Sequence, residues 1–418
     1  MKRLIIFLLM MPAGFFARAQ PVPGDLFKEH TWYNETGDCH GALRVGGKLN
    51  YQLLGGAYRA KGDGKIQPAF DVDLEGALKA EVVIEKMLCH AGTGGLRIII
   101  NGQSPLMVPE PSNIPRPQSA YAHHLNLPVP VDVSVLKSGS GNTFAFEVDT
   151  AGHFWPQNLI YGMILRIYYD PGHLPDRGTI TMPNQGDTLG LLNTIRMEVP
   201  SPGEVSRVDL IGYYEDADLE GNGFYRQWHY SFHKGKIYHH MGSLTGPLTD
   251  PPFELEWNTG WIPNQPDKIK MMGRVVRSDG YMYMTDAVED LLLKRPGMSV
   301  ELCKPYNQPK GWFTREGTFT ENFRIRGDLQ QATASKLVFR SWNPGYFNGI
   351  YINDFLVFIR EGPRYDYFEH HIPVDELYVF NRGENILQTG KTPLYHGEMV
   401  HGVEVQWPGI MVLIRYNH

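Results

Sequence analysis

An internal repeat constrains the fold of this chain more than any other feature of its sequence. Short phrases from the N-terminal third recur, in the same order, between Phe323 and Tyr416. Five pairs match at offsets of 242 to 255 residues: Asp73–Ala77 with Asp328–Ala332, Leu96–Asn101 with Gly349–Asn353, Gly141–Phe144 with Gly383–Ile386, Trp155–Pro156 with Trp407–Pro408, and Leu165–Ile167 with Ile414–Tyr416. Ordered matches at nearly constant offset indicate a duplicated domain with other sequence between the copies.

The composition favours short strands joined by many turns. Aromatic residues make up 12% of the 418 residues, and the chain contains 45 glycines and 30 prolines. We therefore predict an all-β protein. The formal net charge is -6, and no cluster of Lys and Arg residues is present to form the basic face that a nucleic-acid-binding protein needs.

The first nineteen residues have the pattern of a secretory signal peptide. Lys2 and Arg3 precede an apolar stretch, Leu4–Phe16, that is too short to span a membrane. Ala17 and Ala19 fit the small residues of a cleavage site, so cleavage is expected near Ala19. No later stretch is long and apolar enough to cross a bilayer. The sequence therefore predicts a secreted or periplasmic protein.

Export would permit disulfides, and three cysteines are available. Cys39 and Cys89 both lie in the first repeat, and a disulfide between them is one possibility. Three unpaired thiols are an alternative. A zinc site that adds His40 and His90 is another, although neighbouring Cys and His residues lack the usual ligand spacing.

The segment between the repeats has a different pattern. Val205–Leu210, Phe253–Thr259 and Gly280–Thr285 resemble phrases of bacterial immunoglobulin-like domains. The resemblance covers about a hundred residues; it implies a β-sandwich and almost nothing about function.

The repeats themselves resemble galactose-binding-like jelly rolls, the type found in many carbohydrate-binding modules. Each copy has a strand that ends in Ile-Asn, then a Pro-Val segment, then a phrase with glycine shortly before asparagine, which is Gly141-Asn142 in one copy and Gly383-Glu384-Asn385 in the other. Glycine and asparagine at these positions suit a tight turn. The predicted organisation is a signal peptide (1–19), a jelly roll (20–175), a linker with an Ig-like sandwich (176–295) and a second jelly roll (296–418).

An acidic loop is the sharpest local motif. Asp216, Asp218, Glu220 and Asn222 place oxygen atoms at alternating positions, as a calcium loop does. The spacing departs from the EF-hand pattern, because Gln227 stands where a bidentate glutamate belongs. A plain acidic hairpin turn is the alternative, since Asp, Asn and Gly are common in turns.

The segment before the Gly349–Asn353 strand is a candidate glycan site. Exposed aromatic rings pack on the apolar faces of sugars, and a few polar groups fix their orientation. We expect a loop at one end of the sandwich here, with Trp342, Asn343, Tyr346, Phe347 and Asn348 as its glycan contacts. Burial of Trp342 in the core is the alternative. Trp155 and Trp407 occupy matched positions and are expected in the core.

Other reactive side chains form no recognisable catalytic set. The paired histidines, His123–His124, His239–His240 and His370–His371, are expected on the surface, because neighbours on a strand point to opposite faces. Carboxylates expected in loops are Glu35, Asp38, Glu369, Glu398 and Glu404. No catalytic residue is predicted from them.

Three functions fit these features. The first is a secreted glycan-binding or accessory protein of polysaccharide utilisation, with a polysaccharide as its partner. The second is a glycan-active enzyme with a cleft between domains, either a glycoside hydrolase or, less well supported, a glycan amidase. The third is a structural surface protein. Two carboxylates facing each other across a cleft would indicate hydrolysis, and a shallow aromatic platform would indicate binding.

Overall fold

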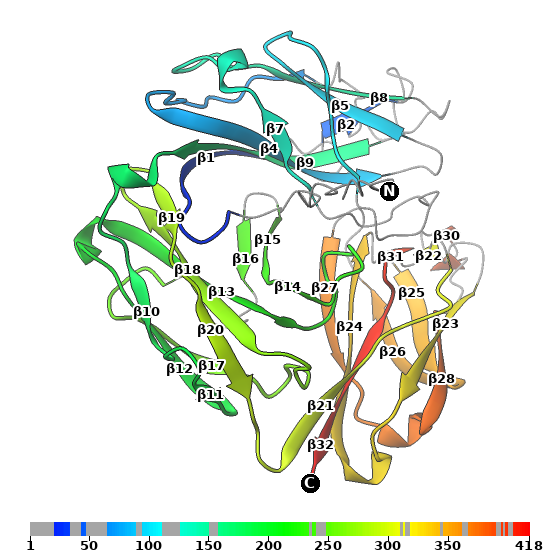
Figure 1. The fold of residues 1–418 in the computed structure, drawn as a ribbon. Coiled ribbons are helices and arrows are strands. Elements are labelled where there is room, and N and C mark those ends of the chain that lie inside the picture. The colour runs from blue at the N-terminus through cyan, green and yellow to red at the C-terminus, as the bar shows by residue number, and fades with distance from the viewer. Residues whose placement is uncertain are drawn as a thin grey trace, which may run out of the picture.

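The computed structural model describes residues 21–33, 43–46, 65–88, 94–110, 126–149, 158–233, 236–239, 248–309, 312–313, 318–342, 346–361, 367–389, 394–395, 398–399 and 404–418. The predicted signal peptide lies outside them. The described residues form strands and short 3-10 turns but no α-helix, which confirms the all-β prediction. Accordingly, no helix in these residues could span a membrane. Figure 1 shows a first sandwich (blue to cyan), a central domain (green) and a third sandwich (yellow to red) around a common centre.

The first sandwich packs two sheets. One sheet contains, in spatial order, β1 (Leu26–Tyr33), β9 (Asn158–Tyr169), β4 (Ala77–Leu88) and β7 (Val129–Val131), with β2 (Leu43–Val45) also paired to β9. The other contains β3 (Lys65–Ile66), β8 (Phe144–Asp149), β5 (Gly94–Ile100) and β6 (Leu106–Met107). The 3-10 turns η2 (Val133–Val135) and η3 (Pro171–His173) follow β7 and β9.

The third sandwich repeats this arrangement. Its first sheet contains β21 (Met298–Cys303), β32 (Met411–Asn417), β24 (Ala332–Trp342) and β27 (Tyr367–Pro373). On the edge of β24 that carries β32, β31 (Glu404–Val405) also pairs with β24, and β22 (Trp312–Phe313) pairs with β31. Its second sheet contains β23 (Phe319–Ile325), β28 (Gly383–Thr389), β25 (Tyr346–Ile352) and β26 (Phe355–Glu361). The smaller elements are η5 (Leu329–Gln331), η6 (Leu377–Val379) and the paired strands β29 (Leu394–Tyr395) and β30 (Glu398–Met399).

The two sandwiches also share strand register. Ala77 pairs with Tyr169 and Ala332 with Tyr416, and in both ladders the register shifts after that pair. The match proposed above for Leu165–Ile167 is therefore two residues out: Ile167–Tyr169 is the true counterpart of Ile414–Tyr416. The proposed match aligned Arg166 with Arg415, whereas the register places Arg166 at the position of Leu413, so the short phrase alone did not fix the alignment.

The central domain is a smaller sandwich. A three-stranded sheet contains β10 (Thr179–Met182), β12 (Leu192–Glu198) and β17 (Phe253–Asn258). The facing strands are β11 (Thr188–Leu189), β20 (Val288–Leu293), β18 (Ile269–Arg277), β13 (Val205–Glu215) and β14 (Arg226–Trp228), with β19 (Met282–Met284) beside β18. The remaining elements are η4 (Pro202–Glu204) and the hairpin of β15 (Tyr230–His233) and β16 (Lys236–His239).

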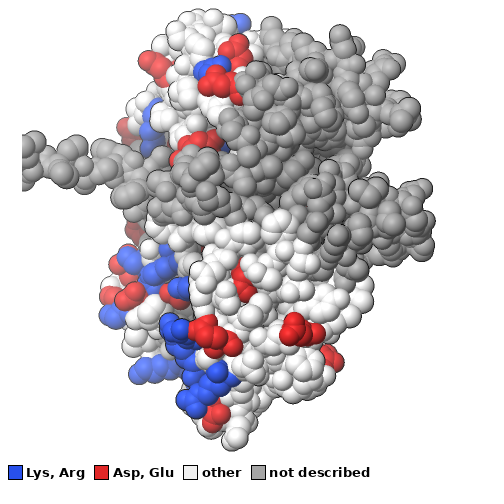
Figure 2. Space-filling view, turned by 90° about the vertical axis from the view of Figure 1, so that its right-hand side faces the viewer, with Lys and Arg blue, Asp and Glu red and all other residues white. Residues whose placement is uncertain are grey.

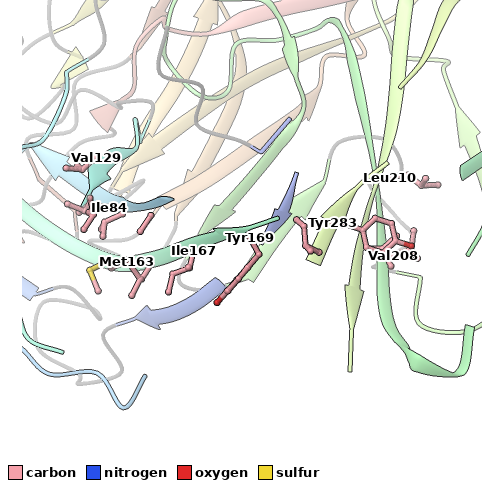
Figure 3. Close-up of a cluster of buried hydrophobic side chains, with 14 of the residues drawn as sticks. Ile84, Val129, Met163, Ile167, Tyr169, Val208, Leu210 and Tyr283 are labelled. Carbon is pink, nitrogen blue, oxygen red and sulfur yellow. The ribbon is translucent and has the colours of Figure 1, made fainter. Parts of the chain in front are cut away.

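A continuous sheet joins the first sandwich to the central domain. Leu26 pairs with Tyr283 and Phe27 with Met282, so β1 and β19 form one ladder. The core is continuous as well: Figure 3 shows it running from Ile84 through Tyr169 to Tyr283. Strand β9 is buried along its whole length, which explains why its sequence is mainly apolar. The third sandwich has a separate core.

Candidate functional site

A pair of asparagines fixes a turn at one end of the third sandwich. Asn353 follows β25 with a φ of 47°, in the left-handed region that asparagine tolerates. Its Nδ2 donates to the carbonyl of Val379 at 2.8 Å and to Oδ1 of buried Asn385 at 2.7 Å. Its Oδ1 accepts from the N–H of Ile386 at 3.0 Å. One side chain therefore ties together the β25–β26 turn, η6 and the start of β28.

The first sandwich contains the same arrangement. Asn101, with a φ of 52°, donates from Nδ2 to the carbonyl of Val135 at 2.8 Å and to Oδ1 of Asn142 at 2.9 Å. Its Oδ1 accepts from the N–H of Thr143 at 2.9 Å. These contacts confirm the predicted equivalence of the two asparagine pairs.

The hydrogen bonds that the two asparagine pairs share identify equivalent positions around the turn in the two sandwiches. Phe355 lies two residues after Asn353, and Gln103 lies two residues after Asn101. In η6, Tyr378 directly precedes Val379, whose carbonyl accepts the hydrogen bond from Asn353. In η2, Ser134 holds the same position before Val135, whose carbonyl accepts from Asn101. The third sandwich therefore has an aromatic residue at both positions, and the first sandwich has one at neither.

Phe355 and Tyr378 form an exposed aromatic pair. Their ring centroids are 5.7 Å apart and their planes meet at 86°, an edge-to-face contact. Phe355 is 48% exposed, Tyr378 73% and the neighbouring Ile386 50%; we call these three residues the aromatic tip. The first sandwich forms the same hydrogen bonds with Gln103 and Ser134 at the positions of Phe355 and Tyr378. Folding of the turn therefore does not require the two rings.

The sheet that carries the aromatic tip has few charges on its outer side. Leu356 and Ile359 of the edge strand β26 are also exposed. Figure 2 views the molecule from the side of β23 and β28; the lower half of the view is largely uncharged, with separate acidic groups and with Lys and Arg gathered along its left edge. Apolar residues gathered on a surface are typical of a contact with a ligand or another molecule. The sequence reasoning missed this site; aligning the two copies position by position would have exposed it.

The glycan segment predicted from the sequence lies at the opposite end of the same strands. Trp342 is the last residue of β24, and β25 begins at Tyr346 and includes Phe347 and Asn348. A connection is present at this end of the sandwich, but the expectation that Trp342–Phe347 is all loop is wrong, because only residues 343–345 separate the two strands. Asn343 and the other four side chains lie outside the described part of the structure. Their contact with a glycan stays a prediction.

The acidic loop, residues 216–223, is held by hydrogen bonds to its own backbone. Asp218 accepts from the N–H groups of Gly221 at 2.9 Å, Asn222 at 3.3 Å and Gly223 at 2.8 Å. Oδ1 of Asn222 accepts from the N–H of Phe224 at 2.8 Å. Burial raises the pKa of Asp218 to about 7, although the three amide donors favour the carboxylate. These contacts are those of a tightly capped turn.

Calcium binding by this loop stays a prediction. Its expected ligands were Asp216, Asp218, Glu220 and Asn222. Nowhere in the described ranges are three or more His, Cys, Asp or Glu side chains grouped to hold a metal ion. If calcium binds only the folded state, a chelator should lower the melting temperature, and the double change Asp216→Ala, Asp218→Ala should remove that response.

The acidic loop joins the antiparallel strands β13 and β14, and it packs against the third sandwich. The N–H of Asp218 lies 3.2 Å from Sδ of Met411. The apolar cluster of this junction contains Ala217, Leu219, Val300, Val338, Met411 and Leu413. The loop therefore serves as a contact between domains, which explains why it is buried despite its charge.

Charged groups line the edge of this junction. Nη2 of Arg340 lies 3.2 Å from Oε2 of Glu369, whose other oxygen lies 2.7 Å from Nε2 of His371. Burial raises the pKa of Asp216 to about 6, despite the nearby charge of Lys336. The junction can therefore gain a proton on Asp216 in mildly acidic solution.

The cysteines give no described metal or disulfide site. Cys303 is buried and unpaired. Cys39 and Cys89 lie outside the described residues, so their disulfide stays a prediction.

One of the histidines departs from expectation. His370 is buried, with Nε2 2.8 Å from Oγ of Ser341 and its ring stacked on Phe339 at 4.4 Å. The prediction of a surface histidine is therefore wrong for His370. It holds for the adjacent His371, which is exposed. His123, His124 and His240 lie outside the described residues.

A buried carboxyl in the third sandwich was also missed. Glu321 is fully buried on β23, and its Oε1 accepts from the N–H of Ile410 at 3.0 Å. Burial raises its pKa well above the usual range. Glu321 pairs with Leu387, whereas in the first copy Ile66 pairs with Phe144 at the corresponding register. An acid therefore replaces an apolar residue at an inward position, a signal that the aligned copies contain.

Comparisons with known proteins do not place the chain in a family. No family model matches it, and no curated protein matches it. Among solved structures, BuGH86 in complex with neoagarooctaose is 12% identical over 54% of this chain and 32% of its own length, with a TM-score of 0.22. A β-porphyranase of glycoside hydrolase family 86 from Bacteroides plebeius is 10% identical over 60% and 45%, with a TM-score of 0.21.

A glycan-binding protein, SGBP-B of Bacteroides ovatus in complex with a mixed-linkage heptasaccharide, is also similar. It is 10% identical over 79% of this chain and 92% of its own, with a TM-score of 0.12. The chain thus spans about a third to a half of the two family 86 structures. Such TM-scores establish no shared fold, so the function is argued from this chain's own geometry.

Proposed function

We propose that the protein is a secreted glycan-binding or accessory protein of polysaccharide utilisation, and that the aromatic tip contacts the glycan. One observation carries the proposal. The exposed pair of Phe355 and Tyr378 stands on a turn whose hydrogen bonds form equally in the first copy, where Gln103 and Ser134 take their places. Folding of the turn does not need these rings, yet they are exposed to water. A ligand that covers the rings accounts for their exposure.

The geometry of the pair suits a sugar. Pyranose rings present apolar C–H faces, and these pack on Phe and Tyr rings. Because the two planes meet at 86°, the tip offers ring surfaces at a right angle to each other. The Tyr378 hydroxyl can donate or accept a hydrogen bond with a sugar hydroxyl. An open site of this kind binds a chain without enclosing it, as an accessory binding protein requires.

The test is retention of the protein by a panel of soluble polysaccharides in affinity electrophoresis, beside thermal melting. The variant Phe355→Gln, Tyr378→Ser installs the residues of the first copy. We expect it to lose retention about tenfold, since each aromatic contact contributes about 0.5–1.5 kcal/mol. Its melting temperature should stay unchanged, because both rings are exposed.

Phe224→Gln is the matched control. Phe224 is 49% exposed, close to the value for Phe355, but belongs to the central domain. It should leave retention unchanged. The proposal fails if no polysaccharide retains the parent protein, or if the control loses as much retention as the tip variant.

The Trp342 segment would give the same sandwich a second contact. It lies at the far end of β25 from the aromatic tip. A polysaccharide that reached both ends would bind more tightly than a short oligosaccharide, because the second contact is made within one complex.

A further inference from the structure

Exposed carboxylates flank the aromatic tip. Asp354 directly precedes Phe355 in the turn, with a φ of 70°. Asp375 and Glu376 stand just before η6, which carries Tyr378, and both are exposed. Glu376 makes no capping hydrogen bond through its side chain. The rings therefore lie between acidic groups on both supporting segments.

Positive charge near the tip is largely neutralised. Arg324 is ion-paired with Glu384. Arg382 is exposed, and it is the remaining cation in segments 353–359 and 375–386, whose side chains the structure describes. Within these two segments, Asp354, Asp375 and Glu376 therefore outnumber the one guanidinium, which leaves the segments with a net negative charge at neutral pH. This charge sets which polymers can approach the rings.

Resting on the proposed function, we infer that the aromatic tip binds uncharged polysaccharides and rejects anionic ones, such as chains that bear uronate or sulfate groups. A neutral chain can lay a sugar face on the rings without an electrostatic cost. An anionic chain brings its charges close to Asp354 and Glu376, where like charges repel. Because these groups are exposed, salt screens the repulsion, and discrimination weakens as ionic strength rises.

The experiment compares neutral glucans, mannans, xylans and galactans with polygalacturonate, alginate and carrageenan, at about 20 mM and about 500 mM salt. We expect the parent protein to be retained by at least one neutral polymer and more weakly by the anionic polymers at low salt. The variant Asp354→Asn, Asp375→Asn, Glu376→Gln should bind anionic polymers about three- to tenfold better at low salt. Its retention by the neutral polymer should not change.

A control of equal charge separates local from overall effects. Asp71→Asn, Glu75→Gln, Glu198→Gln removes three exposed carboxylates from the first sandwich and the central domain. It should leave the discrimination intact. Equal retention of anionic and neutral polymers by the parent would overturn the inference and leave glycan binding standing. Equal gains in the two triple variants would also overturn it. Retention by no polymer at all would instead refute the proposed function, and with it this inference.

Discussion

The two sandwiches use the same face of the same sheet to meet the central domain, but with opposite chemistry. Where the first sandwich meets the central domain, Glu29 lies between Arg166 of β9 and Arg274 of β18, and all three side chains are buried. In the third sandwich, the register places Leu302 where Glu29 stands and Leu413 where Arg166 stands. One junction is therefore a buried ion network, and the other is an apolar contact.

The difference shows which parts of a duplicated fold are fixed by folding and which are free to change. The asparagine pairs, the strand order and the register shift are common to both copies. The outward faces differ because each meets a different surface of the central domain. The first copy extends the central sheet through β1, whereas the third packs its face on the acidic loop.

The largest expected effect comes from breaking the ion network. Burial works to raise the pKa of Glu29, but the charges of Arg274 and Arg166 outweigh it and hold the pKa at about 2. Glu29→Leu, which copies Leu302, leaves two buried arginines without this partner. We expect it to lower the free energy of unfolding by about 3–5 kcal/mol, measured by urea denaturation.

The apolar version of this junction supplies the control. Glu29→Leu, Arg166→Leu, Arg274→Met removes all three charges, and buried ion networks replaced by apolar residues are often as stable as the parent. It should recover most of the lost stability. If the triple variant is no more stable than Glu29→Leu, packing and not charge explains the loss.

The asparagine pairs should show a smaller effect of equal size in both copies. Asn142 and Asn385 are buried, and each side chain both donates and accepts hydrogen bonds with the backbone. Asn142→Ala and Asn385→Ala should each cost about 2–3 kcal/mol, because the abandoned backbone groups stay buried. Urea denaturation measures both. If only one of the two variants loses stability, the same hydrogen bonds do not stabilise the two sandwiches equally.

These equivalences mark how much the sequence could predict. Asn101, Asn142 and their counterparts were found because a turn residue leaves a local signature that survives duplication. Strands were also expected in the central segment from its strand and turn phrases, whereas its Ig-like character stays a prediction. The joining of β1 to β19 was not predictable, because the sequence of an edge strand does not name its partner.

The candidate site was harder to predict than the fold. Phe355 and Tyr378 are far apart in the sequence, and only the hydrogen bonds of Asn353 bring their turns together. The acidic loop was found as a motif, yet its burial depends on Met411, almost two hundred residues away. Such contacts follow from tertiary packing, which a local pattern does not contain.

The buried acid of the third sandwich predicts a pH dependence. The pKa of Glu321 is raised in the folded protein, so the folded state keeps a proton that the unfolded state has already lost. Stability from this group is therefore present below about pH 4 and is lost as the pH rises towards the folded pKa. Glu321→Gln keeps an acceptor for Ile410 but cannot ionise. It should therefore gain stability relative to the parent as the pH rises above about 4, where the unfolded glutamate has lost its proton.

Denaturation at a series of pH values measures this slope. Asp216 and Asp218 have raised pKa values as well and contribute a slope of the same sign, so Glu321→Gln should flatten the curve without removing its slope. Glu376→Gln, which changes an exposed carboxyl of the same sandwich, is the control and should leave the curve in place. Parallel curves for the parent and Glu321→Gln would exclude a titrating Glu321.

The smallest expected effect concerns Trp342, and the first copy again supplies the test. Met87 lies ten residues after Ala77, as Trp342 lies ten residues after Ala332 on the equivalent strand. Trp342→Met therefore installs the residue of the other copy. If Trp342 contacts a glycan, we expect polysaccharide retention to fall about fivefold, the loss of one ring contact of about 1 kcal/mol, with the melting temperature unchanged. Met87 itself is fully buried. A buried Trp342 would give the reverse result, lowered stability with retention intact, and would remove this segment from the glycan site while leaving the aromatic tip in place.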